Sequence, residues 1–189
     1  MRFVRDAVIT LVLIVAVLWI AAYVRVRAGG LSAESQPGRL ERLIAVNLVR
    51  LSIPADAKRL DNPLASDPQA WRSAADHFED HCASCHGDDG RGGTALGESM
   101  YPKAPDLSQP VVQRLSDGEL FYIIQNGVRW TGMPAWRTQH TVDDTWRLVS
   151  FVRKVPTLTS ADIGMISNES HRDSHEHHEH QRTKGEQVR

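Results

Sequence analysis

The sequence predicts an all-α protein in which a membrane-spanning helix precedes one compact helical domain. Residues 7–24, AVITLVLIVAVLWIAAYV, contain no charged side chain. As a helix this run would be about 27 Å long, at about 1.5 Å per residue, close to the ~30 Å thickness of the hydrocarbon core of a bilayer. Three later segments carry signals for helix initiation, and no segment alternates cleanly between apolar and polar residues as a half-buried strand does.

We interpret the apolar run as an uncleaved membrane anchor over residues 7–26, with a cleaved signal peptide as the alternative. The apolar part of a signal peptide is usually about 7–15 residues long, and this run is longer. Trp19 and Tyr23 suit a membrane interface, although Val26-Arg27-Ala28 could serve as a weak cleavage site. Charge leaves the orientation open, because arginines stand on both sides of the run: Arg2, Arg5, Arg25 and Arg27.

Residues 27–62 are expected to form an amphipathic helix and a linker. Large apolar residues recur at spacings of mostly three and four, as on one face of a helix: Leu40, Leu43, Ile44, Leu48 and Leu51. Arginines stand beside them, and Pro54 follows the pattern. Two arrangements stay open: the helix lies on a lipid surface with its arginines against headgroups, or it packs on the domain that follows.

Residues 63–158 are expected to form the compact domain, with three helices. Asp67-Pro68 offers an N-cap and a first-turn proline, and the residues after it share one helical face: Trp71, Ala75, Phe78, Cys82 and Cys85. The run 116–119, SDGE, is a capping box for a second helix that stops at Asn126-Gly127. The run 141–144 starts a third helix, which Pro156 ends.

The two cysteines of the chain, Cys82 and Cys85, stand three apart, and His86 follows directly. Such a pair can be a redox disulfide, half of a zinc site or an attachment point for haem. A structural zinc site needs four ligands, but the chain has no other cysteine, and the nearest downstream histidine, His140, stands alone. A thioredoxin-like pair belongs in a βαβ context, which is missing. The pattern CxxCH therefore favours covalent haem attachment, in which each thiol bonds the porphyrin and the imidazole lies beneath the iron.

A haem of this type takes a second axial ligand, and a thioether raises the reduction potential of the iron into the range of electron carriers. Of the four methionines, Met1 precedes the membrane run and Met165 lies in a polar tail. Met133 lies in GVRWTGMPAW, between turn-forming residues, whereas methionines that fill a core lie in apolar runs. We therefore predict Met133 as the second ligand, with Met100 as the alternative.

The stretch 76–155 resembles the class I c-type cytochromes, in particular small bacterial membrane-anchored proteins with one haem. The resemblance rests on four motifs: FEDHCASCHG, YPKAPDL, LSDGELFYIIQNGVRWTGMPAW and TWRLVSFVRKVP. It implies a cytochrome c fold around one covalently bound haem c, held by Cys82 and Cys85. It further implies that His86 is the proximal axial ligand of the iron and Met133 the distal one.

Three further residues receive a role from the same resemblance. Pro105 matches the proline whose carbonyl accepts the other N–H of the proximal imidazole, a bond that fixes the orientation of the ring. Arg129 and Trp130 match neighbours of the haem propionates. The family attaches haem outside the cytoplasmic membrane, so residues 1–6 are expected in the cytoplasm, and the haem domain and C-terminus in the periplasm.

The expected function is that of a membrane-tethered periplasmic electron carrier, a member of a respiratory chain and not an enzyme. Its partners would be the membrane and redox proteins such as an oxidase, dehydrogenase or reductase complex. A cytochrome subunit through which electrons enter one membrane oxidoreductase, for example a nitric-oxide-reductase-like complex, is the first alternative, and a haem sensor or peroxidase the second. The formal net charge of -1 gives no sign of a nucleic-acid partner.

Residues 159–189 are expected to be a disordered, histidine-rich tail. Five of the nine histidines of the chain lie here, interleaved with acidic residues: His171, His175, His177, His178 and His180. Imidazoles in this density can bind copper, nickel or zinc. The alternative is a solvated tail whose histidines only titrate near neutral pH.

Overall fold

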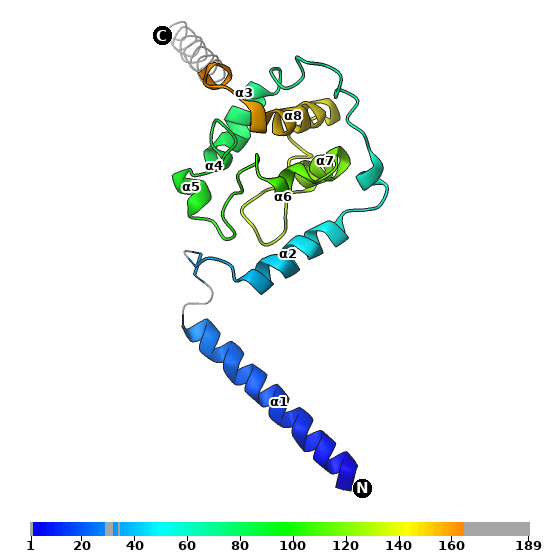
Figure 1. The fold of residues 1–189 in the computed structure, drawn as a ribbon, viewed down its shortest axis with the longest axis vertical. Helices are drawn as coiled ribbons and strands as arrows, with labels where there is room; N and C mark the ends of the chain where they lie inside the picture. The colour runs from blue at the N-terminus through cyan, green and yellow to red at the C-terminus, as the bar shows by residue number, and fades with distance from the viewer. Residues whose placement is uncertain (1, 29–31, 34, 165–189) are drawn as a thin grey trace, which may run out of the picture.

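The fold is described from a computed structural model, which places residues 2–28, 32–33 and 35–164. A long helix, α1 (Arg2–Arg27), lies on one side of a group of much shorter helices (Figure 1). Every regular element in the described part of the chain is helical, which confirms the all-α prediction. Helix α1 has no buried residue, and it is long and apolar enough to cross a membrane by length and composition.

The remaining elements follow one another along the chain with short loops between them. They are α2 (Arg39–Ser52), η1 (Ala57–Arg59), α3 (Ala75–Phe78), η2 (Glu79–Ala83), α4 (Ser84–His86), α5 (Ala95–Glu98), α6 (Pro110–Gln113), α7 (Asp117–Asn126), α8 (Val142–Lys154) and η3 (Val155–Thr157). η1 and η3 are 3₁₀ helices, whereas η2 is a turn of π-helix.

Two of the three predicted helix starts are present as reciprocal caps. At α7, the hydroxyl of Ser116 accepts the Glu119 N–H at 3.1 Å, and the Glu119 carboxylate accepts the Ser116 N–H at 2.8 Å. At α8, Thr141 and Asp144 make the same pair of bonds, at 3.2 and 3.1 Å. Each cap satisfies N–H groups that the first helical turn leaves without a partner inside the helix.

The first helix of the domain starts later than Asp67-Pro68 predicts. Residues 68–74 form turns, and α3 begins at Ala75. The hydroxyl of Ser73 donates to the Ala70 carbonyl at 3.0 Å, so a side chain competes for a carbonyl that a continuous α-helix would use. The π-helix η2 then adds a residue to the turn that leads into the cysteines. Ala83 is consequently buried, while Cys82 and Cys85 are only half-buried.

The core lies between α3, α7 and α8. Phe78 of α3 stacks on Phe151 of α8, with ring centroids 4.2 Å apart, and Phe121 of α7 stacks on Trp146 of α8 at the same separation. Phe151 is fully buried. Helix α8 therefore carries aromatic contacts to both neighbouring helices, and these contacts fix the segment that ends at His86 against the rest of the domain.

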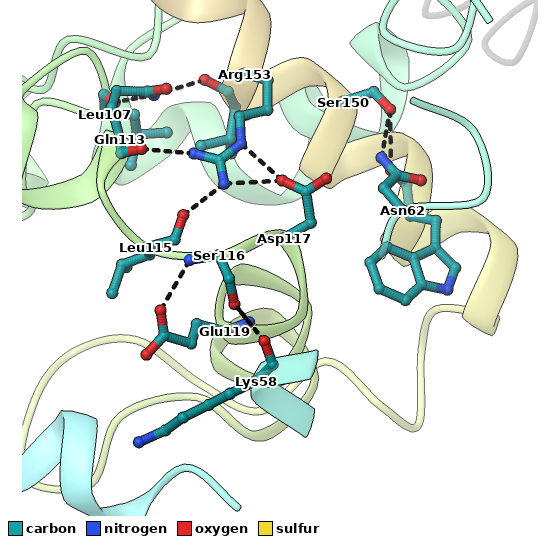
Figure 2. Close-up of polar contacts among 12 residues, drawn as sticks. Lys58, Asn62, Leu107, Gln113, Leu115, Ser116, Asp117, Glu119, Ser150 and Arg153 are labelled. Carbon is teal, nitrogen blue, oxygen red and sulfur yellow. Dashed lines mark hydrogen bonds and ion pairs between the residues drawn. The ribbon is translucent and has the colours of Figure 1, made fainter. Parts of the chain in front are cut away.

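The segment 53–60, before the compact domain predicted from residue 63, packs against that domain. Ile53 is buried, and η1 lies against the start of α7. The hydroxyl of Ser116 donates to the Lys58 carbonyl at 3.0 Å (Figure 2). A Cβ on Gly118 would lie 1.9 Å from the Ala57 carbonyl oxygen, so this close approach of η1 requires glycine.

Buried Asn62 continues this attachment towards α8. Its amide nitrogen donates to the Ser150 hydroxyl at 2.9 Å (Figure 2) and to the Trp146 carbonyl at 3.2 Å. Its amide oxygen accepts the Leu64 N–H at 2.9 Å. All of its side-chain polar atoms are thereby paired, as a buried amide requires. The predicted domain limits of 63 and 158 stay predictions, but segment 53–62 is held by the same helices as the core.

The predicted tail lies mostly outside the described residues. Its first part is helical over residues 160–164. There the Asp162 carboxylate accepts the Thr159 N–H at 3.0 Å, and the Thr159 hydroxyl accepts the Asp162 N–H at 3.2 Å. The five histidines of the tail, and with them the predicted secondary metal site, are beyond the part of the chain that the structure covers.

Candidate functional site

The cysteine pair and His86 lie at the end of the helical segment that begins with α3. Cys82 packs against the hydrophobic core, and both thiols are free, with no disulfide between them. Burial, and after it the neighbouring Cys85 thiol, raise the pKa of Cys82 to about 12. A thiol-exchange or zinc site depends on a thiolate, which these surroundings oppose. A neutral thioether bond to a porphyrin suits them.

His86 has one ring nitrogen paired and the other open to a ligand. Its Nδ1 lies 3.2 Å from the Pro105 carbonyl oxygen, and because a carbonyl can only accept, Nδ1 carries the hydrogen in this contact. Nε2 is then the nitrogen with a free lone pair. Burial lowers the pKa of His86, so the neutral imidazole that an iron ligand must be is favoured. The contact implied between Pro105 and the imidazole is present.

Both candidate methionines lie next to Gly132. The Met100 sulfur is 4.0 Å from the Cys85 sulfur, and a Cβ on Gly132 would lie 2.2 Å from the Met100 sulfur. Met133 is half-buried against the core. Its carbonyl accepts the Val128 N–H at 3.2 Å, and its own N–H donates to the Thr131 hydroxyl at 3.1 Å. The sequence favours Met133, whereas the methionine sulfur that the structure places beside the cysteine pair is that of Met100.

Arg129 and Trp130 lie at the surface of the loop that carries Met133. Both side chains are exposed, Trp130 by 86%. The φ angle of Trp130 is 61°, in the left-handed region that a bulky residue rarely adopts. Neither side chain is drawn into the core, so both are accessible on this loop to a group outside the protein interior, as a propionate is.

A cluster of rings that sequence reasoning did not single out packs beside the cysteine segment. The rings of His77, His81 and His140 lie 5.0–5.9 Å apart between centroids, and His140 stacks on Trp136 at 5.2 Å. His140 is 5% exposed, and neither of its ring nitrogens has a hydrogen-bond partner. The i, i+4 spacing of His77 and His81 was the available signal. Within the described ranges, no group of histidine, cysteine and acidic side chains is arranged to hold a metal ion.

The residues of the site fit a covalently bound haem. They supply two half-buried thiols, of which Cys82 has a raised pKa, an imidazole with Nε2 open, and the thioether sulfur of Met100 beside Cys85. Their sources are one helical segment and two loops, which the core contacts of α8 hold together. This set suits covalent attachment of a porphyrin, and the raised pKa of Cys82 opposes the thiolate that a redox disulfide centre uses.

A comparison with known protein families agrees with this chemistry. Residues 69–152 match the family described as cytochrome c oxidase, cbb3-type, subunit III. Five solved chains match, among them cytochrome CL from the marine methylotrophic bacterium Methylophaga aminisulfidivorans MPT, at 22% sequence identity and a TM-score of 0.40 over 55% of this chain and 70% of that chain. A search of the curated proteins returns no match.

The family match defines the class: an electron-transfer protein that binds haem c, and not an enzyme. The matched range contains the cysteine pair, His86 and both candidate methionines. Residues 69–152 therefore form a c-type cytochrome domain, and an apolar N-terminal helix precedes it in the chain.

Proposed function

We propose that this cytochrome is a membrane-tethered periplasmic electron carrier that holds one haem c between His86 and Met133. The observation that carries the proposal is the contact between His86 Nδ1 and the Pro105 carbonyl at 3.2 Å, directly after the cysteine pair. That bond turns Nε2 away from the carbonyl and fixes the ring, as a second partner does for metal-ligating histidines.

Each residue of the site has a separate task. The haem supplies a one-electron redox centre at its iron. Cys82 and Cys85 retain the group covalently, so the carrier does not lose it between partners. His86 binds in its neutral form. Met133, whose backbone is held by two hydrogen bonds in its loop, would supply a neutral sulfur to the iron, and a thioether ligand would raise the reduction potential.

Helix α1 supports the tether. It is the one described helix long and apolar enough to cross a membrane, and arginines stand at both of its ends. With the haem attached outside the cytoplasm, as the resemblance implies, α1 would leave residues 1–6 in the cytoplasm and the haem domain in the periplasm. A tether keeps the carrier at a high effective concentration beside membrane partners.

A second candidate is a cytochrome subunit that passes electrons into one membrane oxidoreductase. The description of the matched family as a subunit of a cbb3-type oxidase favours it. The two candidates differ in association: an obligate subunit stays with its complex when membranes are solubilised in mild detergent, whereas a carrier separates. Affinity purification of the tagged protein, followed by analysis of the co-purified chains, distinguishes them.

Haem attachment tests the class of site. The haem should remain on the polypeptide through denaturing electrophoresis and extraction with acidified acetone. Cys82→Ala and Cys85→Ala should each leave one thioether bond or none, whereas the exposed Ser84→Ala between them should retain both. Quantitative extraction of haem from the unchanged protein would exclude covalent attachment.

Axial ligation tests the carrier. Met133→Ala should lower the midpoint potential and open the ferrous protein to carbon monoxide, with the haem still attached, and Met100→Ala should change neither property much. The reverse pattern would make Met100 the ligand and leave the carrier function intact. Carbon monoxide binding by the unchanged ferrous protein would favour a sensor or peroxidase instead.

Membrane topology tests the tether. The full chain should fractionate with membranes, and alkaline phosphatase fused after residue 60 should be active, because that position would lie in the periplasm. A natural protein that is soluble and begins near residue 29 would show that α1 is a cleaved signal peptide.

A further inference from the structure

Helix α2 exposes a row of large apolar side chains. Leu40, Leu43, Ile44, Leu48 and Leu51 are each 50–78% exposed, and α2 contains no buried residue. We call these five residues the leucine face. They are half of the large hydrophobic residues exposed between residues 35 and 164, so the exposed apolar surface of that range is concentrated on one helix.

The leucine face points away from the haem domain. At about 100° per residue, its five members lie within one arc of the helix. Of the half-buried residues of α2, Val46 and Val49 lie outside this arc, and Arg50 lies at its edge. Two polar contacts attach α2 to the domain: Tyr101 donates to Glu41, and Lys58 donates to the Arg50 carbonyl at 2.5 Å. The helix thus packs by its smaller apolar residues and leaves the larger ones uncovered.

Something must cover the leucine face for α2 to be stable. A helix of 14 residues is marginal in water on its own, and the domain partly covers only Val46, Val49 and Arg50 of α2. A contiguous apolar surface of this kind marks an interaction site.

The position of α2 in the chain points to lipid. Eleven residues, 28–38, separate the end of α1 from the start of α2, and fully extended they reach at most about 36–40 Å. Figure 1 shows α2 on the side of the domain that is turned towards α1. Any membrane that α1 crosses therefore lies within reach of α2.

The charges of α2 suit an anionic headgroup layer. The helix carries Arg39, Arg42 and Arg50 against the single acid Glu41, and that acid is engaged by Tyr101. Arg39 and Arg50 lie along one edge of the leucine face. An apolar face next to basic side chains is the pattern of helices that lie in the plane of a bilayer interface, where each basic side chain near anionic lipid adds to the attraction.

We propose that α2 lies in the interface of the membrane that α1 crosses, with the leucine face towards the acyl chains and its arginines at the phosphates of anionic lipids. This inference rests on the proposed tether. Because α2 is attached to the domain, a surface-bound α2 holds the haem domain in one orientation to the membrane, in place of free movement on an eleven-residue linker.

Depth measurement on the full-length holoprotein tests the inference. Two variants each carry one nitroxide spin label on an introduced cysteine: Leu48→Cys on the leucine face, and Ala45→Cys at an exposed position outside it. The native sequence, treated with the same label, is the control for reaction at Cys82 or Cys85. In nanodiscs of phosphatidylcholine with phosphatidylglycerol, the label at position 48 should be relaxed by oxygen and shielded from a water-soluble nickel chelate. The label at position 45 should show the opposite preference.

Arginine variants test the proposed contact between the arginines of α2 and anionic headgroups. Arg39→Gln with Arg42→Gln should reduce the shielding of position 48, whereas Arg114→Gln, an exposed arginine of the haem domain, should leave it unchanged. Equal exposure of positions 45 and 48 to the nickel chelate, with the protein still in the nanodisc, would overturn the inference and leave the tether standing. Shielding of position 48 only in native membranes would assign the face to a protein partner, which also overturns it. Loss of the protein from the nanodisc would instead refute the tether.

Discussion

Arg153 joins α8 to the start of α7, and its replacement by methionine should destabilise the haem domain. Its Nε donates to the Asp117 carboxylate at 2.8 Å, Nη1 donates to the Gln113 carbonyl at 2.9 Å, and Nη2 donates to the Leu115 carbonyl (Figure 2). One side chain thereby satisfies two backbone carbonyls and a carboxylate of the turn that leads into α7.

The magnitude follows from these three contacts. Hydrogen bonds to charged groups contribute about 1.5–3 kcal/mol each when buried, but the side chains of Arg153 and Asp117 remain 30% and 25% exposed. Solvent screening reduces the ion pair to about 1 kcal/mol, and each carbonyl that loses its donor costs about 1 kcal/mol. Arg153→Met should therefore lower the free energy of unfolding by about 3 kcal/mol.

Guanidinium chloride unfolding of the full-length holoprotein in detergent, followed by circular dichroism, measures the change. The matched control is Arg147→Met on the same helix, where the arginine pairs only with Asp143 in an exposed i, i+4 contact, and where about 0.5 kcal/mol or less is expected. An equal loss in the two variants, or a loss below about 1 kcal/mol for Arg153→Met, would refute the assignment of Arg153 as the link between α7 and α8.

Three further changes have defined outcomes. Gly118→Ala should detach η1, since its Cβ meets the Ala57 carbonyl, and hydrogen exchange over residues 53–62 should rise. Phe151→Ala should cost about 3–5 kcal/mol in the unfolding assay, because it leaves a cavity beside Phe78. Burial, and after it the neighbouring imidazoles, lower the pKa of His140. Neutral His140 contributes fully to stability above pH 6.5, the ordinary pKa of histidine. This contribution is lost as the pH falls from 6.5 towards the lower pKa of His140 in the folded protein. Between pH 7.5 and 5, His140→Leu should therefore lose less stability than the unchanged protein.

Local sequence determined the elements whose signals lie within a few residues. The caps at Ser116 and Thr141 each use a side chain and an N–H only three residues apart, so the spacing alone predicts α7 and α8. The composition of the apolar run predicts α1 in the same way. The attachment motif is local too, because the thiols and the imidazole of a CxxCH sequence need one helical segment to approach the same porphyrin.

Tertiary structure decided the features that depend on segments far apart in the chain. Asn62 meets Ser150 across 88 residues, and Arg153 meets the Leu115 carbonyl across 38, and nothing near either residue in the sequence states its partner. The periodicity of α2 predicts an apolar face, but only the packed domain shows that this face is left uncovered. His140 could be read as an isolated surface histidine, yet it lies buried between two other imidazoles and Trp136. A pattern along the chain defines which side of a helix is apolar or charged, whereas the neighbour of that side depends on how the whole chain minimises its exposed apolar surface.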